Sequence, residues 1–288
     1  MGIAAGTEGI ARADLGRMGI VALMLQTLRE SGKNTAGWLI RRSRPGYRYR
    51  HSLFILAHMR CGSTALSNIL CSRPDVSGYG EAHIRYDGQG ALGRLALNQM
   101  RRGGWKPQAG LLFDKILHSR YDGEAPPEFF EARAIFVVRR PAEAIRSIVN
   151  LYAKLGRDEY CTQEEAAAYY VERLTALEAL WHRFPARQRT GLTHEALLRD
   201  PDGALAVISS RIGIDPPLEN RYVSLAASRR GGGGDPLRSG QHSRIEPALS
   251  RTACSDELLP DVPAGLVREA EGRFRHLSAL FGEERAAG

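Results

Sequence analysis

The feature that most constrains this chain is an apolar strand that runs directly into a turn of small residues and then into a helix. Residues Ser52–Ala57 read Ser-Leu-Phe-Ile-Leu-Ala, a continuous apolar run with the length of a strand that is buried on both faces. The turn His-Met-Arg-Cys-Gly-Ser-Thr follows at 58–64, and a helix-compatible stretch extends from Ser63 to Cys71. Because this order gathers free backbone N–H groups and the positive end of a helix around one point, it predicts an anion-binding site.

The alternation of strand and helix continues along the chain. We predict further strands at 111–117, 134–138 and 190–193, and helices at 141–155, 162–184, 195–199, 202–212 and 264–281. This order indicates an α/β fold with a central parallel sheet flanked by helices, and such sheets bind ligands at the carboxyl ends of their strands. We divide the chain into a basic N-terminal arm, residues 1–50, and a main domain, residues 51–288.

The positive charge of the chain is concentrated in the arm. The 288 residues include 40 Lys and Arg against 32 Asp and Glu, a net charge of +8. Nine bases and three acids lie in the first 50 residues, so +6 belongs to the arm and only +2 to the rest. A non-catalytic polyanion-binding protein is therefore one alternative. The net charge of the main domain is too small to indicate nucleic-acid binding. We expect the arm to dock on its own domain or on a second subunit of a homo-oligomer.

Composition argues against several other classes of protein. The longest apolar run, Ile20 to Leu25, is far shorter than the roughly 18 residues of a membrane-spanning helix, and no signal peptide is recognisable. The four cysteines have neither the spacing of a zinc site nor that of a disulfide framework. We therefore expect a cytoplasmic protein that does not bind membranes.

The residues of the turn indicate which anion it binds. Gly62 allows a phosphate to approach the backbone, and the hydroxyls of Ser63 and Thr64 can donate to its oxygens. The phosphate loop of kinases reads G-x-x-x-x-G-K-[ST], whereas here Ala57 stands at the first glycine and Ser63 at the lysine. The nearest cation is Arg60. This pattern favours one 5′-phosphate over a triphosphate, and a P-loop kinase or other nucleotide phosphotransferase remains the alternative.

The turn also resembles a family motif. Residues 60–66, Arg-Cys-Gly-Ser-Thr-Ala-Leu, resemble the R-[ST]-G-[ST]-[ST]-x-L motif of sulfotransferases that use 3′-phosphoadenosine 5′-phosphosulfate (PAPS). In that family the motif holds the 5′-phosphosulfate. The resemblance implies nucleotide contacts from Arg60, Cys61, Gly62, Ser63, Thr64 and Ala65. Cys61 replaces the usual hydroxyl residue, and its place at a helix N-terminus beside Arg60 predicts a thiol with a depressed pKa.

Three further segments resemble the same family. The apolar strand 134–138 leads to Arg139, and Ser147 follows eight residues later, as in the family's motif for the 3′-phosphate. Residues 193–201 are similar to the structural Y-E-D-L-x-x-D-P element, and 233–238 are similar to G-G-[ND]-P-x-R, which would bring Arg238 to the nucleotide. The resemblance implies a P-loop NTPase-like sulfotransferase fold over about 52–281, with PAPS as donor, 3′-phosphoadenosine 5′-phosphate (PAP) as product and no required metal.

Sulfuryl transfer to a hydroxyl needs a cation at the leaving phosphate oxygen and a base at the acceptor. Arg60 is the expected cation. The stretch Asp75–His83 resembles the part of tyrosylprotein and related bacterial sulfotransferases that carries the catalytic glutamate, and Glu81 lies 21 residues after Arg60, which is the spacing of that subgroup. The resemblance therefore makes Glu81 the favoured base, with His83 a candidate substrate contact.

His118 is the rival base. The segment Asp-Lys-Ile-Leu-His at 114–118 resembles the K-T-H of cytosolic sulfotransferases with one extra residue. Strand alternation places Lys115 and His118 on opposite faces, so both can face the substrate only across a bulge. We expect Lys115 to be a second cation at the transferred group and the acceptor to be a small molecule with a hydroxyl, such as a sugar, a phenol or a nucleoside natural product.

Overall fold

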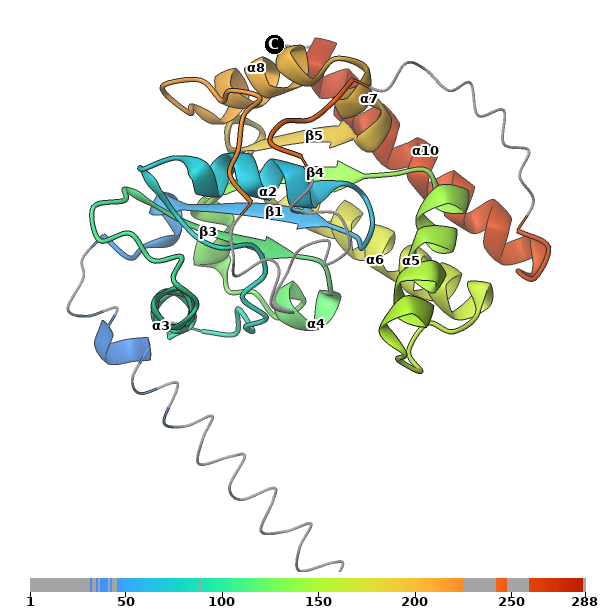
Figure 1. The fold of residues 1–288 in the computed structure, drawn as a ribbon, viewed down its shortest axis with the longest axis horizontal. Coiled ribbons are helices and arrows are strands. Elements are labelled where there is room, and N and C mark those ends of the chain that lie inside the picture. Colours follow the sequence, from blue (N-terminus) through green and yellow to red (C-terminus); the bar gives the residue numbers. More distant parts are fainter. Residues whose placement is uncertain are drawn as a thin grey trace, which may run out of the picture.

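The predicted central parallel sheet is confirmed. The computed structural model describes residues 32, 35, 37–40, 42, 46–88, 90–224, 242–247 and 259–286. Five strands form one sheet in the order β2-β3-β1-β4-β5, and each paired neighbour runs parallel. The strands are β1 (Ser52–Ala57), β2 (Val76–Ser77), β3 (Leu111–Ile116), β4 (Arg133–Val138) and β5 (Arg189–Thr193). Figure 1 shows these strands with the helices that surround them.

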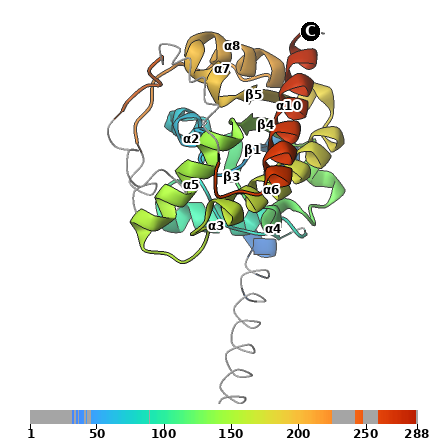
Figure 2. The ribbon, with the colours of Figure 1, turned by 90° about the vertical axis from the view of Figure 1, so that its right-hand side faces the viewer.

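Helices cover both faces of the sheet. The principal ones are α2 (Ser63–Ser72), α3 (Ala91–Arg102), α4 (Ser119–Asp122), α5 (Pro141–Leu155), α6 (Gln163–Arg183), α7 (His194–Arg199), α8 (Pro201–Ile212) and α10 (Ala264–Ala286). Helices α2 and α8 lie on one face, and α6 and α10 lie on the other (Figure 2). The sequence patterns did not predict α3, α4 or β2. The two residues of β2 are too few for a recognisable period.

Local signals explain where the helices begin. Pro141 occupies the first turn of α5, where its missing N–H costs nothing. Helix α6 begins with a capping box, in which the Thr162 side chain accepts from the Glu165 backbone and the Glu165 side chain accepts from the Thr162 backbone. This cap fixes the residue at which α6 begins.

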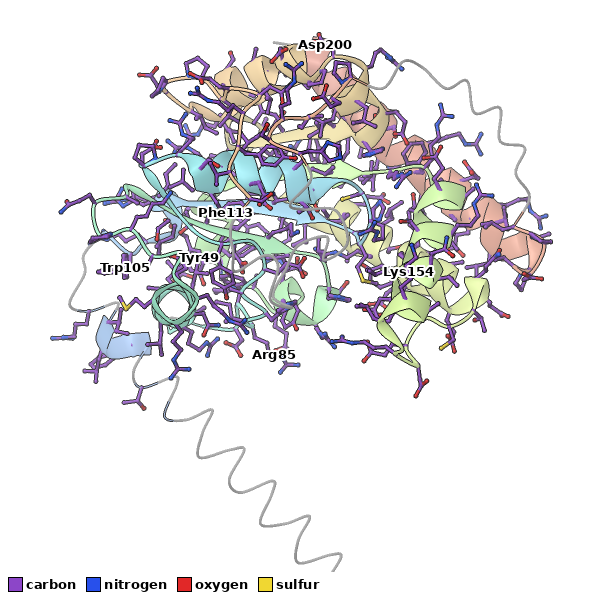
Figure 3. The ribbon with its side chains drawn as sticks, in the orientation of Figure 1. Tyr49, Arg85, Trp105, Phe113, Lys154 and Asp200 are labelled. Atoms are coloured by element: carbon purple, nitrogen blue, oxygen red, sulfur yellow. The ribbon has the colours of Figure 1, made fainter. Side chains whose placement is uncertain are left out.

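The core begins before residue 51. All six residues of β1 are buried, as a strand covered on both faces requires. On the face opposite α2, the ring of Phe54 stacks on Phe129 at 4.6 Å, and Tyr86 meets Phe54 edge-on at 5.0 Å. Tyr49 is only 5% exposed and joins this cluster through an edge-on contact with Phe129 at 5.8 Å; Figure 3 marks its position. Tyr49 therefore packs with the main domain, although the predicted arm includes it.

The strand register brings three chain segments to one edge. The last pairs of β1 join Leu56 to Ile116 on β3 and Ala57 to Val137 on β4. The turn after β1 therefore lies between the residues that follow β3 and those that follow β4. As a result the predicted anion-binding turn is flanked by the segments that carry Lys115 and Arg139.

Some sequence predictions lie outside the described residues. These are the helical part of the arm, the segment 233–238 with Arg238, and Cys254. Gly37 of the arm is described, and it packs so closely on Gly93 of α3 that a side chain at position 93 would collide with it. Within the described ranges, none of the helices combines the length and the apolar character that crossing a membrane requires.

Candidate active site

The turn after β1 has the backbone of an anion cradle. Arg60 and Gly62 both have positive φ, at 63° and 84°, so the chain reverses tightly before α2. Gly62 is the N-cap of α2 and has no side chain with which to cap the first N–H groups of the helix. A Cβ at Gly62 would also collide with the ring of His194. Only glycine fits this position, and no side chain at the N-cap competes with an anion for the first N–H groups of α2.

The side chains of the turn alternate between solvent and core. Gly62, Thr64 and Ala65 are partly exposed, whereas Cys61 and Ser63 are buried. Burial raises the pKa of the Cys61 thiol instead of depressing it. The prediction of a depressed Cys61 pKa is therefore wrong, because the side chain is fully buried among core residues. Cys61 can contact a ligand here only through its backbone.

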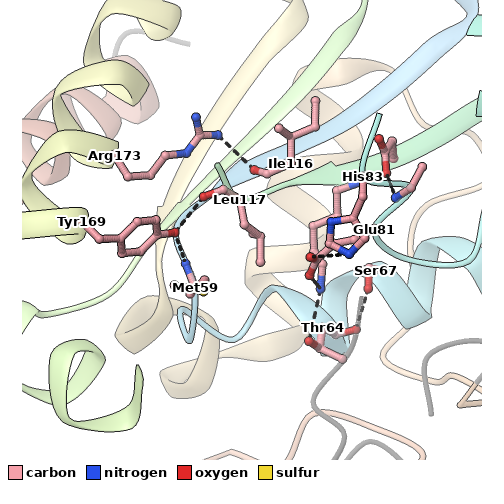
Figure 4. A network of polar contacts seen from close by, with 12 residues as sticks. Met59, Thr64, Ser67, Glu81, His83, Ile116, Leu117, Tyr169 and Arg173 are labelled. Atoms are coloured by element: carbon pink, nitrogen blue, oxygen red, sulfur yellow. Dashed lines mark hydrogen bonds and ion pairs between the residues drawn. The ribbon is translucent and has the colours of Figure 1, made fainter. Parts of the chain in front are cut away.

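A lysine reaches the turn from the neighbouring strand. Lys115 Nζ lies 3.3 Å from Thr64 Oγ1 and 3.2 Å from Glu81 Oε1, and its side chain is 1% exposed. His83 approaches the same carboxylate from the other side, with Nε2 3.6 Å from Glu81 Oε2 (Figure 4). The turn itself lacks the lysine of a kinase loop, but β3 supplies an ammonium group at its rim.

Asp114 holds the segment that carries Glu81. Its Oδ1 accepts from the backbone N–H groups of Ala82 and Lys115, both at 2.8 Å, and its Oδ2 accepts from the Tyr86 hydroxyl at 2.7 Å. Burial raises the pKa of Asp114 to about 7, although the three donors oppose that shift. Sequence reasoning missed this residue. Its only signal was a carboxylate in the middle of a buried strand, which needs partners to be stable there.

His118 lies apart from this cluster. Strand β3 ends at Ile116, so alternation no longer decides where the His118 ring points. The ring packs against Tyr169 at 5.3 Å and Tyr121 at 6.2 Å, and burial lowers the pKa of His118 to about 4. The structure thus joins Glu81 to Lys115 and Thr64, and it places His118 between two tyrosines.

The second motif meets the first. Arg60 Nε donates to Ser147 Oγ at 2.9 Å, and Arg139 Nη1 donates to the Arg60 carbonyl at 3.2 Å. Arg139 also donates through Nε and Nη2 to Glu143, at 3.1 and 2.8 Å. A guanidinium has five N–H donors, so two on Arg139 are not used by these bonds. The sequence-predicted residues Arg60, Arg139 and Ser147 therefore form one contiguous cluster.

A buried histidine connects the two turns. His58 Nδ1 donates to the Met59 carbonyl at 2.7 Å, and Nε2 accepts from the Arg139 N–H at 2.9 Å, which assigns the neutral tautomer with the proton on Nδ1. Burial lowers the pKa of His58 to about 3, in keeping with this neutral form. Sequence analysis included His58 only as a member of the turn, because its hydrogen-bond partner, the Arg139 backbone, is 81 residues away.

One group beside Arg139 has the composition of a metal site. Ligand atoms of Glu143, His194 and Glu195 lie within 4.8 Å of one another. Glu143 already accepts from the Arg139 guanidinium, and Glu195 accepts from the Arg140 N–H at 3.2 Å. The Arg139 guanidinium, 2.8 Å from Glu143, already neutralises one of the carboxylates and disfavours a second cation beside it, so we assign no metal to this group.

Three histidines with lowered pKa values, one buried and two partly buried, predict acid lability. The pKa values of His58, His118 and His194 are lowered to about 3, 4 and 4, so the unfolded chain binds up to three more protons than the folded one between about pH 4 and 6.5. Asp114, with its pKa raised to about 7, binds one more proton when folded and offsets part of this. We expect the free energy of unfolding to fall by up to about 3 kcal/mol for each pH unit below 6.5.

Urea unfolding at intervals from pH 4.5 to 7.5 measures this slope. His58→Gln should reduce it by about one proton equivalent, whereas the same change at the exposed His182 should leave it unchanged. A stability that does not vary over this range would contradict the neutral state of these imidazoles.

Comparison with known proteins agrees with this geometry. Residues 128–217 match the model of the sulfotransferase family, and they include Arg139, Ser147 and the segment 193–201. No curated protein matches the chain. Among solved structures, the sulfotransferase domain of the olefin synthase from Synechococcus PCC 7002 is 20% identical, with a TM-score of 0.52 over 76% of this chain and 93% of that one. The sulfotransferase domain of the curacin biosynthetic pathway is 15% identical, with a TM-score of 0.49 over 78% and 96% of the two chains.

The fold is therefore that of a sulfotransferase domain. The matched segment is similar to the sulfotransferase family over residues 128–217, in agreement with the resemblance that the motifs carry. The turn at 58–64 precedes the matched segment, so its assignment depends on its own residues and on the fold. The closer subgroup, with Glu81 as its marker, stays a prediction.

Proposed function

We propose that this protein transfers the sulfuryl group of PAPS to the hydroxyl of a small-molecule acceptor. The observation that carries the proposal is the junction of Thr64, Lys115 and Glu81 at the N-terminus of α2. It places a hydroxyl donor, an ammonium and a carboxylate beside one anion cradle. These are the groups that such a transfer requires at the leaving oxygen, the transferred group and the acceptor.

The binding residues suit a nucleotide with two separate anionic groups. The uncapped N–H groups at the start of α2, the Thr64 hydroxyl and Arg60 would hold the 5′-phosphosulfate. The two remaining N–H donors of Arg139, together with Ser147, would hold the 3′-phosphate. Since Arg60 and Ser147 are joined by a hydrogen bond of 2.9 Å, the two subsites are neighbours, as a single nucleotide would need.

Three side chains would share the chemistry. As the bond between the acceptor oxygen and sulfur forms, the bond between sulfur and the phosphate oxygen breaks, and Glu81 takes the acceptor proton. Arg60 stabilises the negative charge on the leaving phosphate. The Lys115 ammonium lies 3.2 Å from Glu81 Oε1 and 3.3 Å from Thr64 Oγ1, so it is close enough to the turn to contact the transferred group.

The acceptor would enter beside Glu81. The lining at this point includes Glu81, His83, Leu117 and Tyr121, and it is closed in this structure to anything as large as a water molecule, so an acceptor would have to displace side chains to enter. The His83 side chain is 43% exposed, while Glu81 is 12% exposed, so the imidazole stands between the carboxylate and solvent. An aromatic and polar lining of this kind fits a small hydroxylated molecule, and it leaves the choice among sugar, phenol and nucleoside to experiment.

Calorimetry with PAP and with ATP plus Mg²⁺ tests the proposal. We expect PAP to bind at least about tenfold more tightly, because the turn has no lysine at the kinase position and the Arg139 and Ser147 pair is suited to a 3′-phosphate. Tighter binding of ATP would favour a nucleotide phosphotransferase. A screen of hydroxylated acceptors with PAPS then identifies the substrate class.

A further inference from the structure

Three neighbouring side chains of helix α6 form hydrogen bonds to backbone groups at the ends of three strands. Tyr169, Tyr170 and Arg173 are all buried, and none of them belongs to the motifs that resemble a known family. Arg173 donates through Nε to the Ala57 carbonyl at the end of β1 and through Nη2 to the Ile116 carbonyl at the end of β3, both at 3.0 Å. Helix α6 is thus bonded directly to the edge of the sheet where the site lies.

Tyr169 makes the most specific of these contacts. Its hydroxyl accepts from the Met59 N–H at 2.9 Å and donates to the Leu117 carbonyl at 2.7 Å (Figure 4). Met59 directly precedes Arg60 in the turn, and Leu117 lies two residues after Lys115. One buried hydroxyl therefore joins the backbone of the turn to the backbone of the segment that carries the ammonium.

We propose that Tyr169 is a positioning residue for sulfuryl transfer, an assignment that rests on the proposed function. Its hydroxyl sets the distance between the turn that would bind the leaving phosphate and the strand end that carries Lys115. Because Lys115 pairs with Glu81, the same hydroxyl also influences the position of Glu81. Beyond the last register pair, Leu56 with Ile116, no ladder hydrogen bond joins β1 to β3. Tyr169 and Arg173 supply the connection over that gap.

The adjacent residue provides a matched control. Tyr170 is also fully buried on α6, but its hydroxyl donates to the Arg139 carbonyl at 2.7 Å, at the end of β4. Tyr169→Phe and Tyr170→Phe each remove one hydroxyl from the same helix and leave the ring. If these tyrosines serve only general stability, the two variants should behave alike.

Hydrogen exchange of the protein without ligand tests the connection directly. In Tyr169→Phe we expect peptides covering 57–64 and 113–118 to exchange about tenfold faster, the factor that a lost hydrogen bond produces, while 134–140 is unchanged. In Tyr170→Phe the peptide 134–140 should change and 113–118 should not. Equal changes in both variants, or an unchanged 113–118 in Tyr169→Phe, would overturn the proposal.

Nucleotide binding separates this proposal from the proposed function. In wild type, saturating PAP should slow exchange in both 57–64 and 113–118. In Tyr169→Phe the effect on 113–118 should be lost, and turnover should fall about tenfold. The Kd for PAP should stay within about threefold, because Tyr169 makes no hydrogen bond to the groups proposed to contact the nucleotide. Full transmission of the PAP effect to 113–118 in this variant would refute the positioning role. A wild-type protein that does not bind PAP would instead refute the proposed function.

Discussion

Glu81→Gln should reduce sulfuryl transfer by about 10²–10⁴-fold, the contribution that a positioned general base makes. The amide keeps the size and the hydrogen bonding of the carboxylate but cannot take the acceptor proton. It also leaves the buried Lys115 ammonium without its anionic partner at 3.2 Å, which increases the positive charge near the cradle. We therefore expect the affinity for PAP to stay equal or to rise, while turnover falls.

Steady-state assays with PAPS measure the turnover, and calorimetry with PAP measures the affinity, on the same preparation. Glu178→Gln is the matched control, since Glu178 also pairs with a cation, Arg273 at 3.0 Å, but at the contact of α6 with α10. Turnover near the wild-type rate in Glu81→Gln would exclude Glu81 as the base and direct attention to His118. A parallel loss of PAP binding would assign Glu81 to the nucleotide site instead.

The largest stability effect is expected from Asp122→Ala. Asp122 is fully buried and accepts from Arg173 Nη1 and Nη2, each at 2.8 Å, in a paired fork geometry. Removing the carboxylate leaves the guanidinium as an uncompensated charge inside the protein, which costs about 3–5 kcal/mol. Domains of this kind have only about 5–15 kcal/mol of stability, so the variant should lose a large part of it.

Urea unfolding at pH 7.5 checks this value. Glu178→Ala breaks an ion pair in which the Arg273 side chain is 35% exposed, so its cost should stay below about 1 kcal/mol. A similarly small cost for Asp122→Ala would mean that the carbonyls of Ala57 and Ile116 alone stabilise Arg173. Because Arg173 supports the ends of β1 and β3, we also expect the variant to bind PAP more weakly at temperatures where it stays folded.

Several elements could be read from the sequence because their causes are local. The run Ser52–Ala57 forms a strand with those bounds, and the helix predicted at 141–155 is found at Pro141–Leu155. Apolar periodicity, an N-terminal proline and a threonine cap each act within a few residues. The glycine of the turn was readable for the same reason, since Gly62 adopts φ 84°. Local signals also singled out Arg60 and Thr64 in this turn, whereas Arg139 was predicted through the resemblance to the family's 3′-phosphate motif.

The failures have a common physical origin. The reactivity expected of Cys61 depended on which way its side chain points, and the structure turns it into the core. The expectation that Lys115 and His118 lie on opposite faces of one strand depended on where β3 ends, which pairing with β1 decides. Asp114, His58 and Tyr169 carried no local signal, because each bonds to residues distant in the chain.

The sequence by itself determined the strand, turn and helix that form the anion cradle, together with the cations and the carboxylate available to it. Backbone propensity, glycine at a positive φ and the charge of a helix N-terminus all act over a few residues, so a short stretch of sequence is enough to recognise them. Only the tertiary structure decided that Lys115 reaches the turn from β3, that Glu81 pairs with it, and that Tyr169 and Arg173 hold the strand ends together. Those contacts depend on the order of strands in the sheet and on the face that α6 presents, which arise from burial across the whole domain.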